Sequence, residues 1–174
     1  LTPGDIEAIR EWIEDFGLRA VVLPDIGDSL DGHLIEAETS SLTLGGTPRS
    51  EITIMGESAA TLVIGPSLAK AAKLLKARTG VPDYRFDGLM GLGDCDDFTM
   101  ALAEISGRPV PGKIERHRAQ LQDAMVDCHF MLGFARIAVA ADPDLLGMQV
   151  RFLTGMGAEI VAAVAPHKHE SLAG

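Results

Sequence analysis

The sequence has few cysteines, a shortage of basic residues and no long apolar run, and each absence excludes a class of protein. Two cysteines in 174 residues are too few for a disulfide-rich secreted domain and favour a cytoplasmic location. The 15 Lys and Arg residues against 25 Asp and Glu give a formal net charge of −10. Nucleic-acid-binding proteins usually carry a positive charge instead, and an anionic membrane surface would repel a chain this acidic. No uncharged apolar stretch reaches the roughly 18 residues that a membrane span needs.

Continuous apolar segments predict buried β-strands at residues 19–23, 61–64, 136–141 and 159–165, with a weaker candidate at 82–86. Continuous rather than alternating apolar residues are typical of parallel strands covered on both faces. Apolar residues at helical spacing fill the intervals between these segments. The sequence therefore predicts an α/β fold, a Rossmann-like parallel sheet covered by helices. The polar stretch from 25 to 48 is predicted to be a long surface loop.

The longest helix is predicted from about residue 112 to 132. Its seam comprises Ile114, Arg118, Leu121, Met125, Cys128 and Leu132, all apolar except the arginine. About 20 helical residues span roughly 30 Å, the width of a small domain, so this helix is expected to link two lobes. Residues 1–108 would form a partial middle lobe. Residues 109–174 would form the linking helix and the opening βαβ unit of a second Rossmann-like lobe.

The carboxyl ends of the predicted strands carry the candidate binding residues. Asp25 follows the first strand, Ser67 the second and Asp142 the third. Ligands of open parallel sheets bind in the crevice beyond these ends, so a polar ligand could bind there. The simpler interpretation is that these residues only form turns, because Asp and Ser favour turns.

Other motifs that could carry chemistry are weak. The glycines at 88, 91 and 93 are spaced wrongly for a dinucleotide fingerprint, and a turn leading into a helix is the simpler interpretation. Cys95 is expected to be structural, because the neighbouring aspartates raise the pKa of its thiol. Cys128 lies on the helix seam, which favours core packing over metal binding.

The histidines form no predicted site. His117 and His129 are twelve residues apart, too far for one metal site on a helix. His33 is in the predicted loop without a placed partner, and His167 and His169 belong to the C-terminal tail. We therefore assign no catalytic residue and no metal ligand.

Several short motifs, spread over nearly the whole chain, match one known family. They are Leu-Thr-Pro-Gly-Asp-Ile at 1–6, Leu-Pro-Asp at 23–25, Ser-Leu-Asp-Gly-His at 29–33, Gly-Gly-Thr at 45–47, the run from 55 to 65, Ser-Gly-Arg-Pro-Val-Pro at 106–111 and Gln-Leu-Gln-Asp-Ala-Met at 120–125. Together they resemble the nitrogenase component 1 family. The 29–33 loop and the 106–125 stretch are most similar to the β-like chain of the scaffold that builds the iron–molybdenum cofactor.

The resemblance implies a chain of three Rossmann-like lobes that pairs with an α-like scaffold subunit in an α2β2 assembly. Such an assembly receives an iron–sulfur cofactor precursor, matures it with the nitrogenase iron protein and passes it on. The β-side cysteine ligand of the interface cluster would lie in an N-terminal lobe, so no cluster ligand is carried over to this sequence. We expect this stretch to bind no cofactor and to form an interface, with the chemistry elsewhere.

The chain begins with Leu and its second predicted lobe has only two strands, so we expect a piece of a longer protein. Truncation should expose Leu121, Met125 and Leu132 and the strand edge at 160–164, which favours self-association. Two alternative functions remain open. One is a fragment of the nitrogenase molybdenum–iron protein β subunit. The other is a Rossmann-type lobe that binds a small ligand such as a nucleotide or a sugar phosphate.

Overall fold

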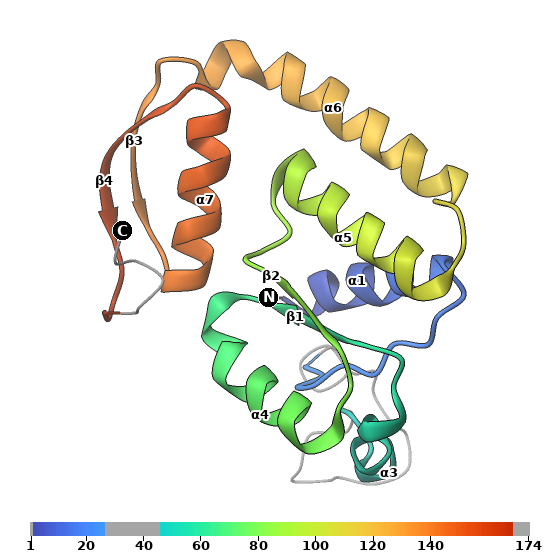
Figure 1. Ribbon diagram of the computed structural model, residues 1–174. Coiled ribbons are helices and arrows are strands. Elements are labelled where there is room, and N and C mark those ends of the chain that lie inside the picture. The colour runs from blue at the N-terminus through green and yellow to red at the C-terminus, as the bar shows by residue number, and fades with distance from the viewer. Residues whose placement is uncertain (1, 27–45, 169–174) are drawn as a thin grey trace, which may run out of the picture.

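A computed structural model describes residues 2–26 and 46–168 (Figure 1). His33 and His169, to which the sequence assigns no role, and most of the predicted 25–48 loop lie outside the described residues. In chain order the elements are α1 (Pro3–Asp15), α3 (Arg49–Thr53), the 3-10 helix η1 (Met55–Glu57), β1 (Thr61–Ile64), the 3-10 helix η2 (Pro66–Leu68), α4 (Ala69–Thr79), β2 (Asp83–Phe86), α5 (Gly91–Ser106), α6 (Gly112–Leu132), β3 (Arg136–Ala140), α7 (Pro143–Gly155) and β4 (Glu159–Val164).

The described strands form two separate parallel sheets, β1–β2 and β3–β4. In the first sheet Thr61 is paired with Asp83, and in the second Arg136 is paired with Glu159. The predicted parallel α/β architecture is therefore confirmed in its coarse form. We call β1 and β2 with α1, α4 and α5 the N-terminal lobe, and β3, α7 and β4 the C-terminal lobe. Helix α6 links the two lobes along one side of the molecule (Figure 1).

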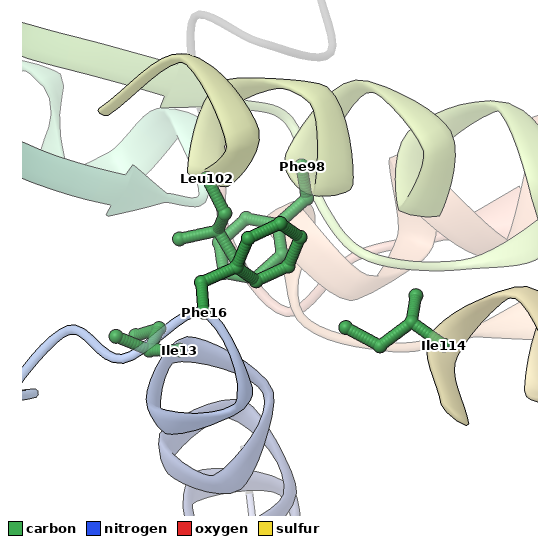
Figure 2. Packing of buried hydrophobic residues seen from close by; sticks show 5 residues of the cluster. All are labelled: Ile13, Phe16, Phe98, Leu102 and Ile114. Carbon is green, nitrogen blue, oxygen red and sulfur yellow. The ribbon is translucent and has the colours of Figure 1, made fainter. Parts of the chain in front are cut away.

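The core of the N-terminal lobe lies between α1, α5 and the sheet. Its buried residues are Ile13, Phe16, Phe98, Leu102 and Ile114, which converge in Figure 2. The ring of Phe98 is fully buried and makes edge-to-face contacts with Trp12 and Phe86, at centroid distances of 5.5 and 5.2 Å. This arrangement suits the quadrupoles of aromatic rings. The boundary at residue 108 stays a prediction, and Ile114 beyond it packs into this core.

Helix α1 begins where the sequence predicts a cap. The Thr2 hydroxyl accepts a hydrogen bond from the Asp5 amide at 3.3 Å, and the Asp5 carboxylate accepts one from the Thr2 amide at 2.7 Å. This reciprocal capping satisfies two backbone donors that the first turn leaves without partners. The hydrogen bonds from Thr2 also lower the pKa of Asp5.

The predicted strand at 19–23 is wrong, because these residues carry no regular secondary structure. A strand is defined by a hydrogen-bonded ladder, and the neighbour that the structure shows for β1 is β2. The extended 19–23 segment is held instead by side chains. The Thr47 hydroxyl donates to the Val22 carbonyl, and Arg19 forms an ion pair with Glu51 at 3.0 Å. The apolar residues at 19–23 correctly indicated partial burial, but they did not indicate a neighbouring strand.

Helix α6 is confirmed, but its exposed surface differs from the prediction. Arg118 reaches Asp96 of α5 with two hydrogen bonds of 2.7 and 2.8 Å, so the seam faces α5. The seam residues expected to be exposed, Leu121, Met125 and Leu132, are therefore only half-exposed. Cys128, expected in the core, is exposed, because the last turns of α6 run past α5 toward β3 (Figure 1).

The large apolar side chains that α6 and its end do expose are Val126, Phe130, Met131 and Phe134, at 62, 89, 81 and 96%. The predicted exposure beside residues 160–164 is confirmed, since Val161 and Val164 of β4 are exposed. Strand β4 lies at the edge of the C-terminal lobe that is turned away from the N-terminal lobe (Figure 1).

Candidate functional site

The structure separates the three predicted strand-end residues. Asp25 lies in the N-terminal lobe, where its carboxylate forms an ion pair with Arg10 at 2.5 Å. Asp142 caps α7, accepting a hydrogen bond from the Leu145 amide at 3.2 Å. Ser67 follows β1 and faces the other lobe. Asp25 and Asp142 therefore have structural contacts, and Ser67 alone joins a contact between the lobes.

The residue that meets Ser67 is Asp144, in the first turn of α7. Its carboxylate accepts hydrogen bonds from the Ser67 amide at 3.2 Å and from the Ser67 hydroxyl at 2.5 Å. The segments that follow β1 and β3 thus come together although the two strands belong to separate sheets, and Ser67 and Asp144 bind each other. The sequence places Asp144 in the segment after the predicted strand, but we selected Asp142 there because Asp144 resembles an ordinary acid of a first helical turn. The available signal was its place directly after a predicted strand and a proline.

Three glycines of the N-terminal lobe allow α7 to approach. A Cβ at Gly65 would lie 2.6 Å from the Asp144 carboxylate, and Gly65 also has a φ of +106°. A Cβ at Gly88 would lie 1.7 Å from the sulfur of Met148. A Cβ at Gly91 would lie 3.0 Å from the Phe152 ring.

The contacting residues of α7, Asp144, Met148 and Phe152, recur every fourth position and so lie on one face of the helix. The glycines at 88 and 91 therefore serve packing between the lobes. Gly91 begins α5, which agrees with the interpretation of this segment as a turn leading into a helix. We call the surface formed by Gly65, Ser67, Gly88 and Gly91 against Asp144, Met148, Arg151 and Phe152 the inter-lobe interface.

Arg151 supplies the cationic part of this interface. Its guanidinium lies 3.7 Å from the Asp87 carboxylate and 3.6 Å from that of Asp94, and the Arg151 side chain is 48% exposed. Ion pairs this long and this exposed contribute little to stability. A cavity of about 220 Å³ adjoins them, lined by Pro66, Asp87, Pro143, Asp144, Gly147 and Arg151. A second hollow of about 420 Å³ lies between β2 and α5.

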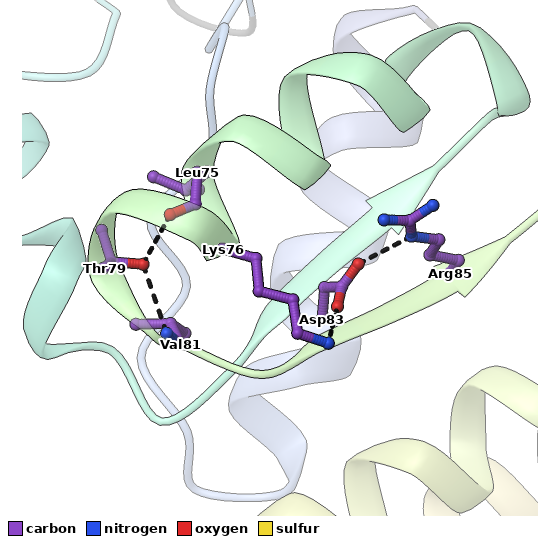
Figure 3. A network of polar contacts seen from close by, with 6 residues as sticks. All are labelled: Leu75, Lys76, Thr79, Val81, Asp83 and Arg85. Atoms are coloured by element: carbon purple, nitrogen blue, oxygen red, sulfur yellow. Dashed lines mark hydrogen bonds and ion pairs between the residues drawn. The ribbon is translucent and has the colours of Figure 1, made fainter.

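A polar network in the N-terminal lobe joins α4 to β2 (Figure 3). The Asp83 carboxylate contacts Lys76 at 2.6 Å and Arg85 at 2.7 Å. These two cations lower the pKa of Asp83 to about 2. At the end of α4 the Thr79 hydroxyl donates to the Leu75 carbonyl at 2.8 Å and accepts from the Val81 amide at 3.2 Å. The network holds the start of β2 against α4. The lowered pKa of Asp83 therefore has a structural explanation.

The two thiols lie in different surroundings. Burial, followed by the nearby charges of Asp94 and Asp96, raises the pKa of Cys95 to about 11, which confirms the predicted direction and adds burial as the larger cause. Its thiol contacts the Leu89 carbonyl at 3.8 Å. Cys128 is exposed on α6, and His117, His129 and His167 are exposed as well.

The described residues include neither a side-chain group suited to a metal ion nor a helix suited to crossing a membrane. Over residues 2–26 and 46–168, no group of three or more His, Cys, Asp or Glu side chains could hold a metal ion. Among the helices in those ranges, none is both long and apolar enough to cross a membrane.

Comparison with known proteins gives a consistent result. The family model described as nitrogenase component 1 type oxidoreductase matches residues 1–173. The chain is 46% identical over 170 residues to the nitrogenase iron-molybdenum cofactor biosynthesis protein NifN of Bradyrhizobium diazoefficiens, covering 98% of this chain and 36% of that protein. It is also 46% identical over 171 residues to NifN of Klebsiella pneumoniae, covering 98% of this chain and 37% of that protein.

A solved structure gives the same fold. Nitrogenase Cp1 at pH 6.5 superposes with a TM-score of 0.83 at 31% identity, over 91% of this chain and 35% of that one. The chain thus spans little more than a third of the length of the relatives that it matches.

Proposed function

The chain belongs to the nitrogenase component 1 family, and we propose that it serves in biosynthesis of the iron–molybdenum cofactor as part of the β-like subunit of the scaffold complex. The relatives named NifN support this role at 46% identity over nearly the whole chain. Since the chain spans about 36% of those proteins, their complete activity is a proposal for it.

Within that role, this chain shapes an interface and leaves the chemistry to other parts of the complex. The observation that carries this proposal is the contact of Ser67 with Asp144, at the strand ends where a Rossmann-type lobe would bind a ligand. The Ser67 donors and the Asp144 acceptors are directed at each other. The iron–sulfur cluster and the cofactor precursor would therefore be held elsewhere in the assembly.

The proposed partners are an α-like scaffold subunit, in an α2β2 assembly, and the nitrogenase iron protein, which would bind transiently. The exposed side chains of Phe130, Met131 and Phe134, close together in the sequence, support a role in assembly, because large exposed apolar groups are typical of interaction surfaces when they form a patch. The formal net charge of −10 disfavours nucleic acid and anionic membranes as partners.

A chimera tests this proposal. The segment of Klebsiella pneumoniae NifN that this chain matches, 171 aligned residues, would be replaced by the present sequence in a nitrogen-fixing host that lacks its own NifN. We expect acetylene reduction to be restored, and the tagged chimera to purify with an α-like partner and bound iron. A soluble chimera that purifies alone and without iron would contradict the proposal.

The same design separates the two alternatives. A matched chimera in the nitrogenase β subunit should fail to restore activity, and the opposite pattern would assign the chain to the catalytic protein. For a small-ligand lobe, a nucleotide or sugar phosphate at 100 times its Kd should stabilise the isolated chain by about 2.7 kcal/mol. Stoichiometric iron on the isolated chain would overturn the expectation that this stretch holds no metal.

A further inference from the structure

We propose that the inter-lobe interface opens as a unit, so that the C-terminal lobe moves relative to the N-terminal lobe with α6 as the hinge. The closed arrangement seen here is one of two states. This inference does not depend on the proposed function, because it concerns only how the two lobes are held together.

The first argument is that the hydrophobic core of the N-terminal lobe is not shared with the C-terminal lobe. The buried cluster of the N-terminal lobe ends at Ile114 and includes no residue of β3, α7 or β4. In the C-terminal lobe, Pro143 and Leu146 of α7 are buried, and so are Met156 and Ala158 just after it. No described strand is shared, because β1–β2 and β3–β4 are separate sheets. Separation of the lobes would therefore leave the core of the N-terminal lobe intact.

The second argument is that the contacts across the interface are few and accessible to water. Ser67 is exposed, and the Arg151 side chain, 48% exposed, lies 3.6 to 3.7 Å from its carboxylates. The cavity of about 220 Å³ between Pro66 and Arg151 leaves part of the interface unpacked. Regions with few buried contacts and exposed hydrogen bonds are those that open below the global unfolding free energy.

The third argument is that the interface is nevertheless specific. At Gly65 the φ of +106° disfavours any side chain, and a Cβ at Gly88 would require the Met148 side chain to move. The closed state therefore has a defined geometry, which distinguishes it from loose contact between two lobes. Packed interfaces of this kind have discrete arrangements rather than a continuum.

The hinge is α6 with its flanking segments. The chain enters this helix through Pro109 and Pro111 and leaves it at Gly133. The hydrogen bonds of Arg118 to Asp96 hold α6 on α5, so the motion would be concentrated at the end of α6 near β3. Hinges are typically a few residues at the ends of elements.

Amide hydrogen exchange on the full chain tests the proposal, because the Ser67 amide donates across the interface at 3.2 Å. In the unmodified protein we expect the Ser67 amide to exchange at least roughly 100-fold faster than the amides of Phe98 and Leu102, since opening precedes global unfolding. Equal protection at these positions would overturn the proposal, because the two lobes would then unfold as one unit.

Matched substitutions sharpen the test. Gly88→Ala places a Cβ against Met148 and should speed exchange at Ser67 at least roughly tenfold, without changing Leu102. Gly93→Ala is the control, since nothing lies within 4 Å of its Cβ. The double variant Gly88→Ala with Met148→Ala should return Ser67 to near its original rate. An unchanged Ser67 rate in Gly88→Ala, or equal acceleration at Ser67 and Leu102, would refute the inference.

Discussion

Replacement of Phe98 by alanine tests the account of the N-terminal core. Phe98 is fully buried and contacts the rings of Trp12 and Phe86 edge to face. Removing a buried phenylalanine side chain costs about 3 to 5 kcal/mol, combining lost transfer free energy with the cavity left behind. That is a large part of the about 5 to 15 kcal/mol that stabilises a typical domain. We therefore expect Phe98→Ala to unfold far more easily than the parent chain.

Urea unfolding followed by fluorescence measures this loss. The chain has a single tryptophan, Trp12, which lies 5.5 Å from Phe98 and so reports on this core. With an m-value of about 2 kcal/mol/M, a loss of about 3 kcal/mol lowers the midpoint by about 1.5 M. Phe130→Ala is the matched control, since Phe130 is 89% exposed, and its midpoint should move by less than about 0.3 M. Equal shifts in the two variants would refute this account.

Three further predictions concern titration, thiol chemistry and capping. The folded pKa of Asp83 is about 2 against an ordinary 3.8, so its stabilisation is complete above pH 3.8 and is lost as the pH falls toward 2. Asp83→Asn should therefore flatten the acid limb of a stability–pH curve measured by thermal unfolding. At pH 8, iodoacetamide should label one thiol quickly: Cys128→Ser should remove the fast phase and Cys95→Ser should retain it, because a pKa of about 11 leaves Cys95 protonated. Thr2→Ala removes the cap of α1 and should cost about 1 kcal/mol in the same urea assay, whereas an unchanged midpoint would mean that the cap contributes nothing.

Much of the fold followed from local patterns. The runs at 61–64, 136–141 and 159–165 became β1, β3 and β4, and the weaker run at 82–86 became β2. Apolar periodicity and capping residues found the long helices, because these signals act within a few turns of the chain. The failure at 19–23 has a physical reason. An apolar run indicates burial, but a strand also needs a neighbouring strand with which to form hydrogen bonds.

The candidate site was only partly predictable. The rule for strand ends selected Ser67, Asp25 and Asp142 equally as binding candidates, and of these three Ser67 is the one that contacts the other lobe. Nothing local marks Asp144, 77 positions further along the chain, as the partner of Ser67. The glycines at 88 and 91 are visible in the sequence, but the sequence does not show that they make room for Met148 and Phe152. Two segments that are far apart in the chain carry no local signal that they pack together.

The sequence by itself determined the α/β class, the family, the long helix near residues 112–132 and the direction in which the pKa of Cys95 is shifted. Each of these depends on interactions between residues that are close in the sequence, or on motifs that can be recognised from the sequence alone. Only the tertiary structure decided that Cys128 is exposed, that 19–23 forms no strand and that the two strand ends bind each other. Those outcomes depend on which surfaces meet in space, and that is decided by the packing of whole elements, such as α7 against the glycines of the N-terminal lobe.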